Sequence, residues 1–278
     1  MEQTPCFFDK RDNSSTKDDK PVVLIIGGHD PGGAGVYADV ETCAANGCLA
    51  LTIITALTSQ NTSKVGRIVP TDIDLVLEQL DMLLEEFSPD AIKIGLIPTE
   101  PLCTEIAQYL SQYLGPCPIV LDPVLKAGGS GTTLNNELVP ESIINHLLPA
   151  VTLVTPNESE LSILTKTDNH GTAIDKLLDT GVDAVLATDL RNATKSIENV
   201  LRCNQPETNV VYKMQRYPKL HHGTGCTLAS AIACSLAKGR TIIEASISGQ
   251  QFVHAAVVHS IDLNLNQNFP NRFYKQRS

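Results

Sequence analysis

The sequence predicts an α/β fold in which a mostly parallel sheet lies between two layers of helices. Three observations predict it: short apolar runs recur along the chain, helix-period segments separate them, and two strand-like segments come late. Each run is apolar at consecutive positions, as in strands that are covered on both faces. The runs are Val22–Ile26, Leu51–Thr55, Ala91–Ile94, Ile119–Leu121, Val151–Val154 and Ala184–Ala187.

Helices are predicted between these runs. In Thr71–Phe87 the apolar residues recur at spacings of three and four, and Thr71 with Asp74 forms a start signal. The other candidates are Glu100–Leu114, Glu137–Leu148, Asn157–Leu164 and Ala173–Thr180. This alternation favours a parallel sheet with helices on both faces. The late segments Ile197–Cys203 and Val210–Arg216 are predicted to be antiparallel strands, followed by two final helices.

The sequence predicts one domain over residues 21–265. The chain has 278 residues, 42% of them hydrophobic, which is enough for one large core. Residues 1–20 are polar and mixed in charge, so we expect a disordered N-terminal tail there. Residues 266–278 are expected to form a polar C-terminal tail.

Composition and charge exclude several classes of partner. Acidic residues number 31 against 21 basic ones, the net charge is -10, and no basic cluster is present, so we expect no nucleic acid partner. Apolar runs fall short of the roughly 18 residues that span a bilayer, and the first residues do not resemble a signal peptide. We therefore expect a cytoplasmic protein with no membrane partner. The eight cysteines form no Cys-x-x-Cys pair and are expected to be mostly buried thiols.

The strongest motif is His222–Thr227, which reads His-Gly-Thr-Gly-Cys-Thr and precedes a predicted helix rich in small residues. Backbone N–H groups of Gly223, Thr224 and Gly225 can converge at the positive end of that helix. Such an arrangement forms an anion hole for a phosphoryl group in transfer. A glycine-rich turn before a buried helix is the alternative interpretation, and the segment alone leaves both open.

A second glycine-rich segment, Gly27–Gly35, follows the first apolar run. Its spacing does not match the Gly-x-Gly-x-x-Gly of dinucleotide-binding proteins. The polar Asp30 inside this turn instead indicates a loop that binds a hydroxyl group of a small substrate.

Polar residues also lie near or after the carboxyl ends of three more of the predicted strands. They are Lys93, Asp122 and the Thr155–Glu160 segment. Ligands of open α/β sheets bind beyond the carboxyl ends of the strands, so these residues are expected to converge. Oxygen atoms of Asp122, Asn157 and Glu160 could hold Mg²⁺. Asn157 and Glu160 also fit a helix capping box, which needs no ligand.

In order and approximate spacing these motifs resemble the hydroxymethylpyrimidine-phosphate kinases of thiamine biosynthesis, which belong to the ribokinase-like superfamily. The resemblance covers most of the chain from Val22 to about His259. It rests on Asp30–Gly35, Asp39, Ile54–Thr62, Lys93–Gly95, Asp122–Val124, Thr155–Glu160 and His222–Thr227. Ribokinases in general have aspartate after Gly-x-Gly, whereas the pyrimidine kinases and some related pyridoxal kinases have cysteine. Cys226 is therefore the most diagnostic residue.

The resemblance implies a ribokinase-like three-layer sandwich and a homodimer. It also implies an enzyme that uses ATP and Mg²⁺ to phosphorylate 4-amino-5-hydroxymethyl-2-methylpyrimidine and then its monophosphate. The implied catalytic residues are Gly223, Thr224, Gly225 and Cys226. The implied substrate site is Gly28, Asp30, Gln60, Lys93 and Val124, with Gln60 hydrogen-bonding the ring. The implied nucleotide site is Asn157, Glu160, Thr188, Gly223 and Gly225, and the metal ligands are Asp122, Asn157 and Glu160.

Cys226 has two possible roles. A thiol at a helix N-terminus is expected to have a lowered pKa, which suits a base or proton relay for the attacking hydroxyl. It can also be a packed small residue.

The chain departs from the family in two places. The loop around Asp30 lacks one residue, which could displace Asp30. Residues 188–191 read Thr-Asp-Leu-Arg where relatives have Lys-Gly-Gly-His near the nucleotide, which predicts weaker binding of ATP phosphates unless Arg191 compensates. A pyrimidine-binding protein without turnover therefore remains an alternative. Pyridoxal kinase is another, because pyridoxal is also a flat heteroaromatic ring with a hydroxymethyl group.

Overall fold

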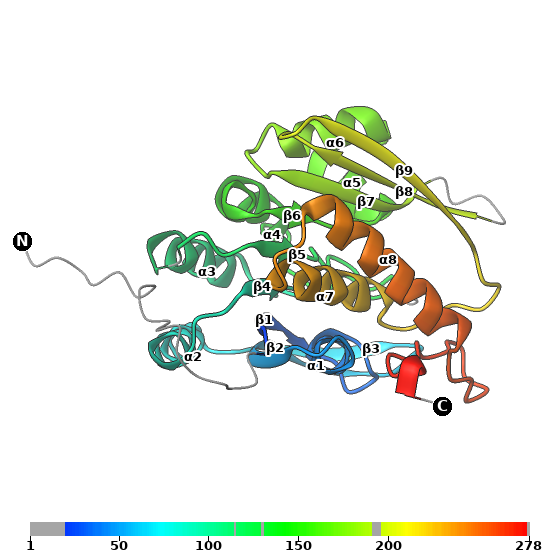
Figure 1. Cartoon of the computed structure of the whole chain (residues 1–278). Helices are drawn as coiled ribbons and strands as arrows, with labels where there is room; N and C mark the ends of the chain where they lie inside the picture. The colour runs from blue at the N-terminus through cyan, green and yellow to red at the C-terminus, as the bar shows by residue number, and fades with distance from the viewer. Residues whose placement is uncertain (1–19, 114, 129–130, 191–195, 277–278) are drawn as a thin grey trace, which may run out of the picture.

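The computed structural model describes residues 20–113, 115–128, 131–190 and 196–276, and these adopt the predicted three-layer α/β sandwich (Figure 1). The strands of this part of the chain form one nine-stranded sheet in the order β3-β2-β1-β4-β5-β6-β7-β8-β9. Pairing is parallel from β2 across to β7 and antiparallel at both edges. The expected fold class is confirmed, including the late antiparallel strands.

All six predicted runs are strands, and the structure adds β3. The strands are β1 Val22–His29, β2 Leu49–Gln60, β3 Val65–Pro70, β4 Ala91–Ile94, β5 Ile119–Leu121, β6 Leu153–Val154, β7 Ala184–Leu190, β8 Ser196–Cys203 and β9 Thr208–Gln215. Strand β3 lies at the edge of the sheet, and most of its residues are exposed. It therefore lacks the apolar run by which the buried strands were predicted.

Helices cover both faces because successive residues of a strand point to opposite sides. In β1, Leu24 and Ile26 pack in one core, while Val23 and Ile25 pack in the other. The first core is covered by α2 Ile73–Glu86, α3 Glu100–Tyr113, α4 Val139–Ser142, α5 Glu158–Thr165 and α6 His170–Leu178. The second is covered by α1 Gly35–Ala45, α7 Thr224–Ala237 and α8 Ile242–Val258. The short helices are η1 Ile143–Leu147, η2 Leu148–Ala150 and η3 Tyr274–Gln276.

Two predicted helix boundaries were wrong. Helix α2 starts after Asp72, whose side chain accepts from the Leu75 N–H, so Asp72 and not Thr71 caps it. The helix predicted at Glu137–Leu148 begins only at Val139 and continues as a π turn. Pro140, in the first turn of α4, suits a helix start.

Small residues bring α7 close to its neighbours, as the sequence predicts. A Cβ added at Gly249 of α8 would lie 2.5 Å from Ile232 of α7, so the two helices are in close contact. Helix α7 also contacts β1, β4 and β5. Its first turn therefore lies at the carboxyl ends of the central strands.

The expectation of a polar tail at 266–278 is wrong for the described part of that segment. Gln267 and Arg272 are buried, and both side chains find hydrogen-bond partners inside the fold. Composition cannot reveal such partners, because they lie far away in the sequence. The tail expected at 1–20 lies outside the described residues except for Lys20, which is exposed. None of the described helices is both long and apolar enough to cross a membrane.

Candidate active site

A cavity of about 540 Å³ opens beyond the carboxyl ends of the central strands. This size is within the range of small-molecule sites. Every residue that the sequence assigned to a site lines this cavity: Gly28, Asp30, Gln60, Lys93, Asp122, Val124, Asn157, Glu160, Thr188, Gly223, Thr224, Gly225 and Cys226. The predicted convergence is confirmed, and the role of each residue remains a prediction.

The start of α7 has the geometry of an anion site. Gly223 is the N-cap at φ 81, and its carbonyl accepts from the Thr227 N–H. The first N–H groups of a helix have no partner within the helix and point outward from its start. A Cβ at Gly225 would lie in van der Waals contact with Asp122, 3.7 Å from its Oδ2, so the glycine leaves this space open. The open N–H groups can therefore receive phosphoryl oxygens.

The structure corrects the expected pKa of Cys226. Its thiol is only 8% exposed, and burial raises its pKa, as do the nearby carboxylates of Asp122 and Asp39. The Lys93 ammonium and the Gly35 N–H act in the opposite direction but do not prevail. Cys226 is therefore a thiol at neutral pH when the cavity is empty, and it donates a hydrogen bond to Asp122.

A buried ionic network lies beneath the cavity. Lys93 Nζ is 2.9 Å from Asp39 Oδ2, and the Ser230 hydroxyl donates to the other Asp39 oxygen. Burial alone would lower the pKa of Lys93, but the charges of Asp39 and Asp122 raise it. Lys93 therefore stays a cation and supplies a positive charge at the base of the site.

Asp122 and Glu160 form a pair of buried carboxyls whose charges repel. Burial, and then the nearby Asp122 charge, raises the pKa of Glu160 to about 8. Burial likewise raises the pKa of Asp122, although Lys93 opposes it. A divalent cation would stabilise the ionised forms of both carboxyls and so oppose the rise in both pKa values. These residues therefore fit Mg²⁺.

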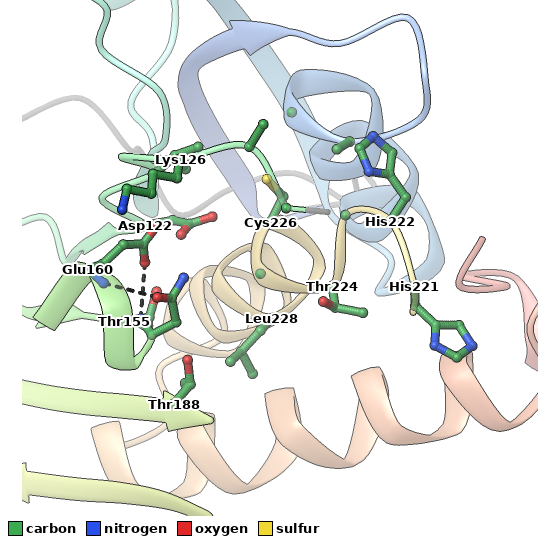
Figure 2. Close-up of a pocket in the computed structure, with 18 of the residues that line it drawn as sticks. Asp122, Lys126, Thr155, Glu160, Thr188, His221, His222, Thr224, Cys226 and Leu228 are labelled. Carbon is green, nitrogen blue, oxygen red and sulfur yellow. Dashed lines mark hydrogen bonds between the residues drawn. The ribbon is translucent and has the colours of Figure 1, made fainter. Parts of the chain in front are cut away.

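Few protein side chains are available as metal ligands near Asp122 and Glu160. Among the described residues, no group of three His, Cys, Asp or Glu side chains is placed to hold a metal. Mg²⁺ commonly keeps several waters and binds through one or two carboxylates together with phosphates. Figure 2 shows Asp122 and Glu160 side by side at the edge of the cavity.

Asn157 and Glu160 also form the capping box that the sequence allowed. Asn157 Oδ1 accepts from the Glu160 N–H, and Glu160 Oε2 accepts from the Asn157 N–H. The other Glu160 oxygen accepts from the Leu125 N–H. Glu160 is thus held in place by backbone groups at the start of α5, and the structural and functional interpretations are compatible.

Asp30 is buried and held by three groups, despite the shorter loop. His222 Nε2 is 2.7 Å from Asp30 Oδ2, and the Gly32 N–H donates to the other oxygen. Burial opposes ionisation, but the bonds from His222, Gly32 and Gln60 keep the pKa of Asp30 below its usual value. We call the surface made by Asp30, Gln60 and His222 the glycine-loop wall.

The opposite surface comes from the ends of β7, β8 and β9. We call it the hairpin wall; it consists of Thr188, Asp189, Ile197, Asn199 and Met214. Asp189 adopts a left-handed φ of 53 and is ion-paired with Arg216. This ion pair offsets the negative charge that Asp189 brings to the segment 188–191. Arg191, the expected substitute, lies outside the described residues.

Sequence reasoning gave no role to several polar residues of this cavity, among them His222, Gln267 and Lys126. His222 begins the strongest motif but was assigned no role, whereas the structure pairs it with Asp30. Gln267 lines the cavity and donates to the Thr62 carbonyl. Lys126 lines it too, and Figure 2 shows its side chain extending towards Asp122 and Glu160. The sequence did contain a signal for Lys126, because this lysine begins a glycine-rich stretch that follows a predicted strand.

Comparison with known proteins agrees with this geometry. Residues 30–271 match the family model described as phosphomethylpyrimidine kinase. A probable thiamine biosynthetic bifunctional enzyme of Oryza sativa subsp. japonica is 33% identical over 87% of this chain and 45% of its own length. The chain thus spans about half of that relative. A hydroxymethylpyrimidine/phosphomethylpyrimidine kinase of Rhizobium meliloti is 32% identical over 88% of this chain and 94% of its own.

Solved structures share the ribokinase-like fold. Staphylococcus aureus pyridoxal kinase in complex with pyridoxal has a TM-score of 0.83 at 26% identity, covering 93% of this chain and 95% of its own. Phosphomethylpyrimidine kinase from Clostridium difficile has a TM-score of 0.73 at 28% identity, covering 86% and 99%.

Proposed function

Because the chain belongs to the phosphomethylpyrimidine kinase family, we propose that it phosphorylates 4-amino-5-hydroxymethyl-2-methylpyrimidine and then its monophosphate, using ATP, in thiamine biosynthesis. The observation that carries this proposal is the convergence of three elements in one cavity. They are the open start of α7, the Asp122–Glu160 carboxyl pair and the glycine-loop wall. We also propose that the protein works as a cytoplasmic homodimer.

The acceptor would lie against the glycine-loop wall. The Asp30 carboxylate, kept ionised by its three hydrogen bonds, would orient the hydroxymethyl group. Gln60 uses its amide N–H on Asp30, so its carbonyl would accept from the amino group of the pyrimidine. This arrangement holds the acceptor oxygen in one orientation, which supplies much of the catalysis in phosphoryl transfer.

In the transfer step, the hydroxyl oxygen would form a bond to the γ-phosphorus while the bond to the β-phosphate oxygen breaks. The N–H groups of Gly223, Thr224 and Gly225 would stabilise charge on the transferred group. Asp122, Asn157 and Glu160 would hold Mg²⁺, which neutralises charge on the phosphates when bound. The hydroxyl proton would pass to Cys226, whose raised pKa makes its thiolate a strong base that is present only in a small fraction.

Pyridoxal is the second candidate acceptor, favoured by the higher TM-scores to pyridoxal kinases. Both molecules are flat heteroaromatic rings with a hydroxymethyl group, so the same wall could orient either. Gln60 favours the pyrimidine, because its carbonyl needs an amino donor.

Product analysis tests the proposal directly. Purified protein is incubated with ATP and Mg²⁺ and with the hydroxymethylpyrimidine, its monophosphate or pyridoxal, and products are identified by mass spectrometry. A Gly225→Val protein purified in the same way controls for contaminating kinases. We expect the pyrimidine monophosphate and diphosphate. Phosphorylation of pyridoxal alone would assign the second candidate, and binding of the pyrimidine without any product would assign a binding protein.

A further inference from the structure

The C-terminal segment returns from the end of α8 to the side of the molecule that carries α1 (Figure 1, red). Its residue Arg272 lies just beyond the part of the chain that matches the family model, which ends at residue 271. Arg272 is nevertheless only 3% exposed. A guanidinium that is buried to this extent needs several polar partners to offset its lost hydration.

Arg272 joins three parts of the chain that are far apart in sequence. Its Nε donates to Thr227 Oγ1 at 2.9 Å, and its Nη2 donates to the Gly33 carbonyl at 3.0 Å. Its Nη1 is 2.8 Å from Glu41 Oε2. One planar group thus connects the first turn of α7, the first glycine loop and α1.

The contacts of Arg272 with Thr227 and Gly33 lead to the proposed anion hole. The Thr227 hydroxyl that accepts from Arg272 donates to the Gly223 carbonyl at 2.7 Å. Gly33 precedes Gly35, whose N–H contacts the Cys226 sulfur. A Cβ at Gly223 would lie 2.8 Å from Arg272 Nη2, so the guanidinium lies directly against this N-cap.

Anchoring of the C-terminus does not depend on this side chain. The backbone of Asn268 exchanges hydrogen bonds with Leu220 and His222, and the Asn271 N–H donates to the Ala256 carbonyl. Phe269 also packs edge-on against the His222 ring. The segment is therefore held in place by other contacts, and the three bonds of Arg272 serve another purpose.

We propose that Arg272 is a positioning residue that holds the first glycine loop and the start of α7 at the spacing which the anion hole requires. The planar guanidinium carries five N–H donors and can reach all three acceptors at once. A lysine ammonium cannot present its donors in this planar arrangement. The inference rests on the proposed function for the anion hole and for the choice of acceptor substrate.

Arg272→Ala and Arg272→Lys test the proposal, with Arg202→Ala as the matched control. Arg202 is ion-paired with Asp175 and does not line the cavity. We expect Arg272→Ala to lower kcat about 10- to 100-fold at nearly unchanged KM, because small misplacements of reacting groups cost rates of this order. Added guanidinium ion should restore part of kcat, and Arg272→Lys should recover less than the parental rate. Arg202→Ala should keep the parental kcat.

Amide hydrogen exchange supplies a measurement that needs no substrate. In Arg272→Ala, the amides of residues 33–35 and 223–227 should exchange faster, while those of β5 and α3 should not. Arg202→Ala should leave both sets unchanged. Unchanged exchange at 33–35 and 223–227, or a parental kcat per folded molecule, would overturn the positioning role. If the parental protein phosphorylates no pyrimidine but these amides are loosened as expected, the proposed function fails while the positioning role stands.

Discussion

The two walls of the cavity differ in how they are built. On the glycine-loop wall, Asp30 and His222 are buried and bonded to each other. On the hairpin wall, Asn199 is buried, but Thr188, Ile197 and Met214 are only half-buried, and Asp189 relies on an ion pair with the partly exposed Arg216. Buried charges tolerate little change because an unpaired one is costly, whereas partly exposed ones are screened by water. If the walls bind as proposed, the acceptor would lie against buried charged groups that are bonded to each other, whereas the nucleotide would lie against a wall that tolerates substitution better.

The largest effect is expected where the two walls meet, at the start of α7. Gly225→Val would place a side chain beside Asp122 and fill the space of the phosphoryl oxygens. Loss of one such donor group costs about 10²- to 10³-fold in kcat, and blocking the whole site should cost more. Steady-state kinetics and thermal unfolding check this.

Gly171→Val is a matched control, because Gly171 has the same position in the first turn of α6 and lies outside the cavity. It should keep activity. Near-parental turnover by a stably folded Gly225→Val protein would contradict the anion hole.

The second-largest loss of kcat is expected on substitution of Cys226. Cys226→Ala should lower kcat by about 10²- to 10⁴-fold, the usual contribution of general-base assistance, with little change in ligand affinity. Cys103→Ala removes a buried thiol of α3 that does not line the cavity, and it should have no such effect.

The pH profile tests the corrected pKa. Since burial raises the pKa of Cys226, the thiolate fraction keeps growing as pH rises between about 6 and 9. Activity that depends on the thiolate should therefore rise with pH across this range without a plateau. The alanine variant should lack this rise. A parental rate in that variant would leave the cysteine with a packing role alone.

The sequence could reveal the position of Cys226 but not the direction in which the pKa of its thiol shifts. The glycines and small residues around it predicted a helix start, because those signals are local. Burial raises its pKa, as do the carboxylates of Asp122 and Asp39, and the fold alone brings these distant residues to it. The sequence therefore located the residue correctly and gave the wrong direction for its pKa.

The same distinction explains the rest of the site and fold. The site residues were found because parallel strands end at one edge, so residues after each strand converge. The bond between Asp30 and His222 spans 192 positions, and local patterns cannot predict such a pair. Arg272 was assigned to a tail because its acceptors lie at least 45 positions away. Strand β3 was missed because an exposed edge strand carries no apolar run.

A smaller effect is expected on the glycine-loop wall. Gln60→Leu should raise KM for the pyrimidine about 5- to 150-fold and leave KM for ATP unchanged, since a lost hydrogen bond to a buried group costs about 1–3 kcal/mol. Gln215→Leu, at the end of β9 and outside the cavity, is the control. Equal increases of both KM values would assign Gln60 a structural role.

The smallest effect is expected on the hairpin wall, at the Arg216–Asp189 ion pair. Arg216→Ala would leave the Asp189 carboxylate uncompensated at the rim of the cavity, where it would repel the phosphates of ATP. Because both side chains are partly exposed, the cost should be below about 1 kcal/mol, which corresponds to a rise in KM for ATP of up to about fivefold. KM for the pyrimidine should stay unchanged.

Two further variants isolate this charge effect. Lys213→Ala removes an ion-paired cation of β9, outside the cavity, and should leave KM for ATP at the parental value. Adding Asp189→Asn to Arg216→Ala removes the uncompensated charge and should restore KM for ATP. Restoration would show that the hairpin wall needs charge neutrality more than any particular cation, which would explain how it can function with Thr188 where the family resemblance leads us to expect a lysine. If the double variant binds ATP as weakly as Arg216→Ala, Arg216 contacts the nucleotide itself, and both walls depend on specific contacts.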